Sequence, residues 1–393
     1  MKNLWDEKEA KNYESDLALR VYSSNLLGRS DELVLHGGGN TSVKKVAWDQ
    51  DVLFVKGSGW DLVSIEEEGF APVELTFLQD MAKVEALSDT QMVQGQKKAM
   101  LNKEAPNPSV EAILHAIIPF KYVDHTHADA VVTISNCSSG IENIKKIYPN
   151  FLIVPYVMPG FILARTIYEM TKKLDWSKCE GIILHNHGIF TFDDDAKRSY
   201  DKMIDAVTIA ENFLEENAKL QIDETLTPIE FDTEKLKDII SEEKNSEIFI
   251  NINQSPLALH YSSQDNLDSF ATRGVLTPEH IIRTKRAPLI LEANDNIQTK
   301  IEQYKKEYIT YFERFKKGET MLNPAPNYAV IKNFGIVSFG KSQKEANIIN
   351  DIITHTMTAV LKADMLGGYE SISYQDSFDM EYWELEQAKL KKQ

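Results

Sequence analysis

Apolar positions in the first half of the chain follow helical and strand spacing in turn. Residues 14–27 place apolar side chains at helical spacing and end at Gly28, which predicts a helix. Further helices are expected at 75–87, 108–118, 160–173 and 196–219. Apolar runs predict strands at 32–35, 52–55, 116–123, 151–157 and 181–184. This mixed order of short strands and helices indicates a layered α/β domain and not a doubly wound parallel sheet.

The second half carries a string similar to one in the first. Residues 328–339 match residues 181–192 at an asparagine, a glycine and a phenylalanine, and each string leads into a helix, the second at 342–361. Two histidines of the first string are replaced by Lys332 and Phe334. We interpret the second string as part of a degenerate repeat; the alternative is a chance match between two strand–helix units.

These patterns predict the domain organisation. Residues 222–246 are acidic and polar with few aromatic side chains, which is typical of a linker. We expect a three-layer α/β/α catalytic domain at 1–222 and a linker at 223–246. A smaller α/β domain at 247–365 would repeat that fold without metal ligands, and 366–393 would form a C-terminal tail.

Composition narrows the class of partner. The chain has 393 residues, 60 acidic against 43 basic, and a net charge of −17, so neither nucleic acid nor an anionic membrane is an expected partner. An anionic substrate would need a local cationic or metal-centred pocket. Two cysteines, a charged N-terminal segment and the lack of a long apolar run predict a cytoplasmic protein.

Four of the nine histidines form two His-x-His pairs, His125/His127 and His185/His187. Each pair follows an apolar run that predicts a strand, and residues i and i+2 of a strand point to the same face. Each pair can therefore aim two imidazoles at one point, as a divalent metal requires. The alternative is that histidines at strand ends only form hydrogen bonds at the surface.

The expected ligands are His125, His127, His187 and Glu111, because zinc favours imidazole nitrogen with carboxylate or water. Three imidazoles argue against magnesium, although another divalent transition metal would also fit. His187 is preferred over His185 because Gly188 follows it and lets the backbone approach closely.

Two glycine-rich turns offer backbone amides. The first covers residues 37–42 and the second residues 57–59, and hydroxyls stand nearby at Thr41, Ser42, Ser58 and Ser109. Such amides can cradle a phosphate or carboxylate, although a tight turn that needs positive φ explains the glycines equally well. Neither turn matches a sequence motif for binding dinucleotides or nucleotides.

Taken together, these strings resemble the class II aldolase/adducin family. The resemblance rests on Gly-Gly-Gly-Asn-Thr-Ser (37–42), Lys-Gly-Ser-Gly (56–59), Pro-Ser-Val-Glu (108–111), His-Thr-His-Ala-Asp (125–129) and Asn-His-Gly (186–188). Strings at 154–160, 277–286 and 378–390 are similar to the aldolase part of bifunctional rhamnulose-1-phosphate aldolase/lactaldehyde dehydrogenases. Those proteins continue into a dehydrogenase domain, so NAD-dependent activity is not expected from this chain.

The resemblance implies a zinc-dependent aldolase that cleaves a ketose 1-phosphate, such as rhamnulose 1-phosphate, to dihydroxyacetone phosphate and an aldehyde. The metal would stabilise the charge that develops on the ketone fragment, and Glu111 would transfer the proton. Asn40, Ser58, Gly59 and Ser109 would bind the phosphate, although relatives have a second serine where this chain has Val110. A homo-oligomer is also implied, and a neighbouring chain would then supply the proton donor for the aldehyde oxygen.

Two other functions fit the same motifs. Relatives with these ligands epimerise or dehydrate sugar phosphates, and ligand spacing does not separate those reactions from cleavage. Adducin-like domains are non-catalytic interaction modules, but they lack the metal histidines. The basic cluster Arg283, Lys285 and Arg286 is either an anion contact or a solvated surface turn.

Overall fold

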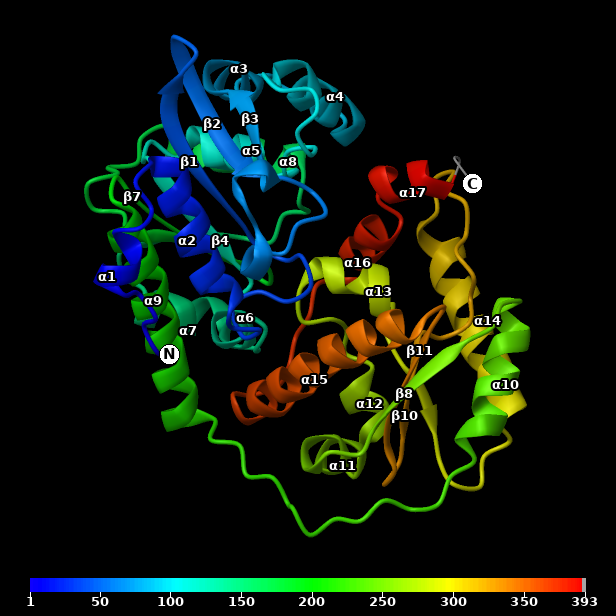
Figure 1. The fold of residues 1–393 in the computed structure, drawn as a ribbon. Coiled ribbons are helices and arrows are strands. Elements are labelled where there is room, and N and C mark those ends of the chain that lie inside the picture. Colours follow the sequence, from blue (N-terminus) through cyan, green and yellow to red (C-terminus); the bar gives the residue numbers. More distant parts are fainter. Residues whose placement is uncertain (391–393) are drawn as a thin grey trace. The chain divides into compact units, whose positions relative to one another are not determined.

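The computed structural model describes residues 1–390, so the last three residues of the predicted tail, 391–393, lie outside the described residues. The described chain divides into two compact units (Figure 1). Unit 1 comprises residues 1–135 and 140–213, and the described part of unit 2 comprises residues 136–139 and 214–390.

Unit 1 contains a seven-stranded sheet with the order β3-β2-β1-β4-β7-β6-β5. Only β5 and β6 pair in parallel; every other neighbouring pair is antiparallel. The strands are β1 (Asn40–Ala47), β2 (Gln50–Lys56), β3 (Phe70–Glu74), β4 (Tyr122–Thr126), β5 (Phe151–Val154), β6 (Gly181–Leu184) and β7 (Gly188–Asp193). The helices are α1 (Glu7–Ala10), α2 (Asp16–Gly28), α3 (Leu75–Met81), α4 (Asp89–Ala99), α5 (Ala112–Ile117), α6 (Asp129–Ser135), α7 (Gly140–Ile147), α8 (Phe161–Thr171) and α9 (Ala196–Asn217).

Helices cover both faces of this sheet, which confirms the predicted α/β class (Figure 1). Helices α3, α4, α5 and α8 pack on one face and share a core with the strands. Helices α2 and α9 lie on the other face. Strand β4 shows the alternation that results: Val123 joins the first core, whereas Thr126 donates a hydrogen bond to Met203 of α9.

Four element predictions in unit 1 are wrong. The strand expected at 116–123 begins only at Tyr122, because residues 116 and 117 end helix α5. Residues 32–35 form a turn and not a strand, because Leu33 and Val34 both donate backbone hydrogen bonds to Ser30. Residues 40–42 belong to strand β1 and not to the glycine turn, and β1 is the strand that pairs with β4. The helix expected at 75–87 ends at Met81, and a capping box at Ser88 starts a separate helix, α4.

Unit 2 contains a four-stranded sheet with the order β8-β11-β10-β9, in which β9 and β10 pair in parallel. The strands are β8 (Phe249–Asn253), β9 (Leu289–Leu291), β10 (Tyr328–Ile331) and β11 (Gly335–Gly340). The helices are α10 (Thr233–Lys244), α11 (Pro256–Ser262), α12 (Leu267–Ala271), α13 (Ile281–Thr284), α14 (Ile297–Phe315), α15 (Gln343–Met365), α16 (Tyr374–Glu381) and α17 (Glu384–Leu390). Helices α10 and α14 share an apolar core with one face of the sheet.

Two segments of unit 2 are more ordered than their composition predicts. The expected linker contains helix α10, because Leu236 and Ile240 fall one turn apart and are buried in the core. The expected tail contains helix α16, whose Phe378 packs with Phe312 of α14. In both segments a few apolar residues at helical spacing outweigh a polar average composition.

The two similar strings have the same local structure. Each forms an antiparallel hairpin, β6–β7 or β10–β11, whose second strand begins at Gly188 or Gly335. Each turn places an asparagine in the left-handed region, Asn186 at φ 58° and Asn333 at φ 56°. The likeness therefore extends from sequence to turn geometry, as an internal repeat would produce.

In the described residues, no helix is both long enough and apolar enough to cross a membrane.

Candidate metal centre

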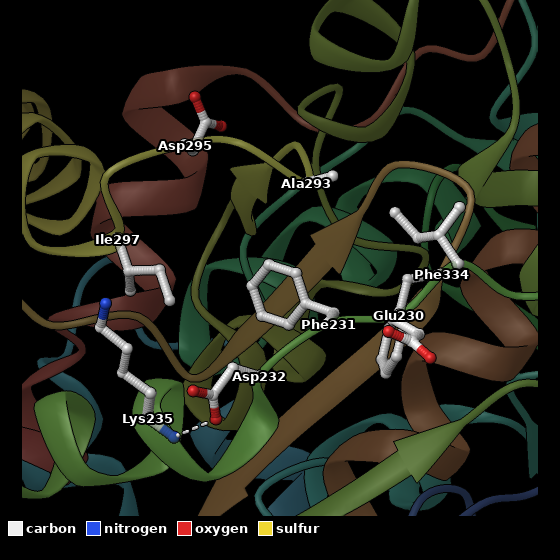
Figure 2. A pocket seen from close by; sticks show the side chains of 9 residues that line it. Glu230, Phe231, Asp232, Lys235, Ala293, Asp295, Ile297 and Phe334 are labelled. Atoms are coloured by element: carbon white, nitrogen blue, oxygen red, sulfur yellow. Dashed lines mark hydrogen bonds between the residues drawn. The ribbon is translucent and has the colours of Figure 1, made fainter.

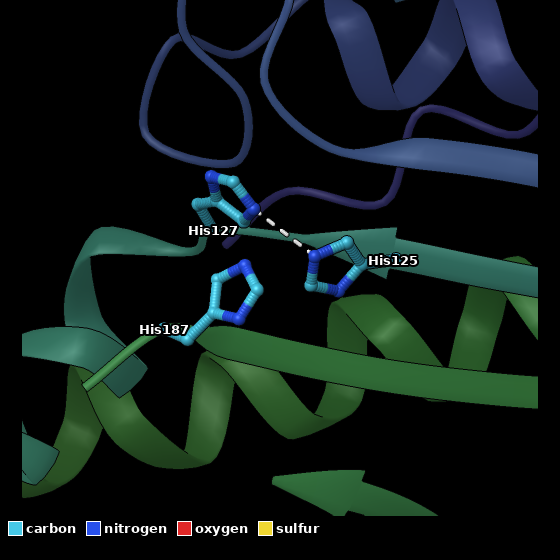
Figure 3. Close-up of side chains that lie close together, drawn as sticks. All are labelled: His125, His127 and His187. Carbon is cyan, nitrogen blue, oxygen red and sulfur yellow. Dashed lines mark hydrogen bonds between the residues drawn. The ribbon is translucent and has the colours of Figure 1, made fainter. Parts of the chain in front are cut away.

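Three histidine rings converge where β4 ends and the β6–β7 hairpin turns (Figure 3). His125 is the fourth residue of β4, His127 follows the strand, and His187 immediately precedes β7. One nitrogen of each ring lies within 4.8 Å of the nitrogens offered by the other two. His125 and His187 are buried, whereas His127 is partly exposed. His185 is not a member of this group.

His125 is held so that one ring nitrogen faces its neighbours. Its ring stacks on Phe190 with centroids 4.1 Å apart, and its Nδ1 lies 3.0 Å from the carbonyl oxygen of Ile189. A carbonyl only accepts hydrogen bonds, so Nδ1 carries the proton and Nε2 is the unprotonated nitrogen. This is the tautomer that a metal ligand needs.

Glu111 completes the group from the start of α5. It is 4% exposed; its Oε2 lies 3.4 Å from His125 Nε2, and its Oε1 lies 3.9 Å from His187 Nε2. Oε2 accepts a 2.7 Å hydrogen bond from Asn40 Nδ2. Among the described residues, no group donates a hydrogen bond to the buried Oε1.

These residues fit a divalent metal ion. Two ligand nitrogens on a tetrahedral ion with bonds of about 2.0–2.1 Å lie roughly 3.3 Å apart. The Nε2 atoms of His125 and His127 are 3.0 Å apart, close to that separation. A buried carboxylate oxygen without a donor is costly unless a cation faces it, so Glu111 Oε1 supports the same interpretation. Imidazole ligands favour a transition metal over magnesium.

Asp124 belongs to the same motif but has a different role. It alternates with His125 along β4 and points to the opposite face, where its Oδ1 lies 2.5 Å from Arg20 Nη2 of α2. Ser199 of α9 donates a further hydrogen bond to its carboxylate at 2.5 Å. This fully buried ion pair fixes β4 between two helices and so positions the histidines on its other face.

Gly188 allows the hairpin to approach the metal group. A Cβ atom at this position would lie 2.4 Å from the carbonyl oxygen of Thr126 and 2.9 Å from His125 Cε1. Both distances are shorter than any real side-chain contact, so the backbone of one strand would have to shift. Only glycine therefore keeps His187 beside the other two rings.

We expect Gly188→Ala to destabilise the protein by about 1–3 kcal/mol, the usual cost of overpacking, and to weaken metal binding. Thermal unfolding with and without Zn²⁺ would measure both effects. Gly59→Ala is the control for a glycine substitution in the same unit, since a Cβ atom there meets nothing within 4 Å, although its positive φ adds some strain. Equal metal binding by both variants would contradict the view that the close backbone approach at Gly188 positions His187.

The residues expected to bind phosphate are only partly arranged for it. Ser58 and Gly59 are exposed, and Ser109 is partly exposed. The amide of Ser58 donates to Asn107, and that of Ser109 donates to Lys56, so neither is available to a ligand. The buried side chain of Asn40 contacts Glu111 at one end and His115 at the other.

Sequence reasoning missed two residues near this group. Lys56 is buried, its Nζ donates to the carbonyl of Gly37, and burial lowers its pKa to about 8 despite the opposing charges of Asp61 and Glu111. His115 is fully buried and contacts Asn40. Two sequence signals could have indicated these residues: a lysine directly before the second glycine-rich turn, and a histidine one helical turn after Glu111.

The basic cluster of unit 2 is not a solvated turn. Lys285 is buried, with its Nζ 3.6 Å from the ring centre of Tyr308, and Arg286 lies 3.8 Å over the ring of Tyr374. Arg286 also donates to the backbone carbonyls of Thr272 and Ile372. Arg283 alone is exposed, so the three residues do not form a common anion site.

Unit 2 has a cavity of about 640 Å³ beside its own hairpin (Figure 2). Phe334, which corresponds to His187 in the similar strings, lines this cavity. The rest of the wall combines apolar and charged side chains; it consists of Ile229, Glu230, Phe231, Asp232, Lys235, Ala293, Asp295 and Ile297.

Two family models match the chain. The model of the Class II Aldolase and Adducin N-terminal domain matches residues 20–214, which includes every residue of the metal group. The model of the Aldolase class II, second domain, matches residues 232–390.

The chain is 41% identical to the N-terminal class II aldolase domain of a conserved protein from Thermoplasma acidophilum, over 55% of this chain and 99% of that one, with a TM-score of 0.50. It is 29% identical over 425 residues to a Bacillus subtilis protein described as the uncharacterized oxidoreductase YuxG. That match covers 99% of this chain and 60% of the relative, so the chain spans less than two thirds of this relative's length. A third similar protein is L-fuculose-1-phosphate aldolase from Thermus thermophilus, at 14% identity over 51% of this chain and 96% of that one, with a TM-score of 0.34.

Proposed function

Because the chain belongs to the class II aldolase and adducin family, we propose that it is a metal-dependent aldolase acting on a ketose 1-phosphate. The proposed reaction yields dihydroxyacetone phosphate and an aldehyde. The observation that carries the proposal is the convergence of three imidazole nitrogens within 4.8 Å of one another beside the buried carboxylate of Glu111. A non-catalytic module would gain nothing from burying these groups together without a cation.

His125, His127, His187 and Glu111 would hold the ion, for which we propose Zn²⁺. When bound, such an ion supplies Lewis-acid stabilisation of the negative charge that carbon–carbon cleavage leaves on the ketone fragment. Glu111 would transfer the proton at the carbon where the bond breaks, because its Oε1 accepts no hydrogen bond from the described residues. The partly exposed side of the group, at His127, is where substrate would enter.

Lys56, Ser58, Gly59 and Ser109 would bind the phosphate. Lys56 provides the positive charge that an anionic substrate needs on a chain with a net charge of −17. Hydroxyls of Ser58 and Ser109 would add hydrogen bonds, and the exposed Gly59 lets the backbone approach the ligand. Asn40 is left out of this set because its amide is engaged within the protein.

The pKa of Lys56, about 8, predicts how phosphate binding depends on pH. The ammonium is charged below that pH and loses its proton above it, so KM for the phosphorylated ketose should rise as pH increases through about 8. Lys56→Met should raise KM by about 10–100-fold at neutral pH, the worth of a hydrogen bond to a charged group. Initial-rate kinetics between pH 6 and 9.5 would measure both effects.

Lys45→Met is the control, since Lys45 lies over the ring of Phe54 on the neighbouring strand. It should leave KM and its pH dependence unchanged. A Lys56→Met enzyme with normal KM would remove Lys56 from the phosphate site.

The motifs shared with rhamnulose-1-phosphate aldolases lead us to propose rhamnulose 1-phosphate as the first substrate to test. Purified protein loaded with Zn²⁺ would be incubated with ketose 1-phosphates, and dihydroxyacetone phosphate would be measured by a coupled dehydrogenase. Release from at least one ketose is expected, together with loss of the activity after chelation. Conversion of a sugar phosphate without any three-carbon product would instead indicate an epimerase or a dehydratase.

A further inference from the structure

Four buried residues form a continuous hydrogen-bonded chain that ends on Glu111. Ser42 Oγ lies 2.7 Å from His115 Nδ1, His115 Nε2 lies 2.5 Å from Asn40 Oδ1, and Asn40 Nδ2 lies 2.7 Å from Glu111 Oε2. Ser42 and His115 are 0% exposed, and Asn40 is 7% exposed. The proposed reaction itself assigns no role to Ser42 or to His115.

The strands and helix α5 dictate this arrangement. Asn40 and Ser42 alternate along β1 and so point to one face of the sheet, and Asn40 pairs directly with His125 of β4. His115 lies on α5, one helical turn after Glu111, and therefore on the same side of that helix. The helix thus presents both the carboxylate and the imidazole to the polar side chains of β1.

Every hydrogen bond in the chain points toward Glu111. An ionised carboxylate only accepts, so the Asn40 amide must turn its NH₂ group to Glu111 and its oxygen to His115. That oxygen also only accepts, so His115 carries its proton on Nε2. A neutral ring then accepts on Nδ1, and the Ser42 hydroxyl donates to it. The ring is completely buried, which favours its neutral form.

We propose that His115 is a positioning residue that fixes the Asn40 amide, and through it Glu111, in the orientation required by the metal group. With Oε2 held by Asn40, the carboxylate can present only Oε1 to His187 and to the reacting carbon. Without His115, the Asn40 amide could rotate by half a turn and place its oxygen against the carboxylate. This inference rests on the proposed function for its catalytic consequence, but the hydrogen-bonded chain can be tested without any substrate.

The first test is spectroscopic. Metal-free protein labelled with ¹⁵N-histidine would be studied by long-range ¹H–¹⁵N NMR, with the His115 signals assigned from their absence in His115→Gln. We expect the Nε2–H tautomer from pH 6 to pH 8. An Nδ1–H tautomer or a charged ring would overturn the proposal, whatever reaction the protein catalyses.

The second test compares variants. His115→Leu should weaken Zn²⁺ binding, measured by competition with a chelator, by about 10–100-fold, the usual effect of losing a group behind a metal ligand. In steady-state kinetics it should lower kcat by a similar factor while KM stays within about threefold. His115→Gln should restore most of both values, because its amide can donate to Asn40 and accept from Ser42. Thermal unfolding of each variant shows whether it is folded.

A double variant distinguishes a positioning role of His115 from general damage to the core, because it shows whether the losses of Zn²⁺ affinity in the two single variants add. If His115 acts through Asn40, the double variant His115→Leu/Asn40→Ala should bind Zn²⁺ no more weakly than Asn40→Ala alone. The proposal would be overturned if the double variant lost Zn²⁺ affinity by the product of the two single losses. It would also be overturned if His115→Gln were as impaired as His115→Leu. If no ketose is cleaved but the tautomer and Zn²⁺ affinities are as expected, the proposed function fails and the positioning role stands.

Discussion

Replacing Glu111 with glutamine is expected to lower kcat for ketose cleavage by about 10²–10⁴-fold, the range over which a positioned acid or base contributes. Glutamine has the same shape and its side-chain oxygen can still accept from Asn40, so the fold should survive. It cannot take up a proton at the position of Oε1. Dihydroxyacetone phosphate release under saturating ketose would measure the loss.

The control for Glu111→Gln is Glu104→Gln, which changes an exposed carboxylate in the segment leading to α5. That variant should be as active as the unmodified protein. Thermal unfolding of the Glu111→Gln protein would establish that it is folded. Turnover within a few-fold of normal in that protein would remove Glu111 from proton transfer.

Loss of one imidazole should have the largest effect on metal binding. We expect His127→Ala to weaken Zn²⁺ binding by more than about 100-fold, which exceeds the effect of residues behind the ligands. Activity should disappear with the metal. His127 is partly exposed, so its removal opens no sealed cavity and the fold should remain intact. Metal content after dialysis, measured by mass spectrometry, gives the result directly.

His185→Ala is the matched control, because His185 comes from the other pair and lies outside the metal group. It should retain about one Zn²⁺ per chain. Equal metal loss in both variants would mean that the choice between His185 and His187 was wrong. Full metal content in His127→Ala would contradict the ligand set.

The sequence predicted those parts of the site that depend on local periodicity. His125 lies in β4 and His127 just past its end, and their rings converge as the i, i+2 spacing predicts. His187 joins them because Gly188 allows close approach. Helix α2 and strand β6 were likewise readable from apolar spacing alone. Helix α2 buries only some of its residues and β6 is buried at all four, so in both elements the apolar pattern can be recognised from neighbouring residues alone.

What the sequence did not reveal depends on contacts between distant segments. Strand β1 was missed because Lys44 and Lys45 interrupt its apolar pattern, although pairing with β2 and β4 makes it a central strand. The resemblance predicts phosphate binding for Asn40, and this stays a prediction. The hydrogen bonds of Asn40 to Glu111 and His115 join positions more than seventy residues apart and were not foreseen. No local pattern specifies such a contact.

X-ray absorption spectroscopy of the zinc-loaded protein tests the central claim most directly. We predict one zinc ion per chain with three imidazole nitrogens at about 2.0–2.1 Å and a carboxylate oxygen in the remaining shell. His127→Ala should lose one of the imidazoles or the ion itself. A spectrum with fewer than three imidazoles in the unmodified protein, or no stoichiometric zinc, would contradict the account.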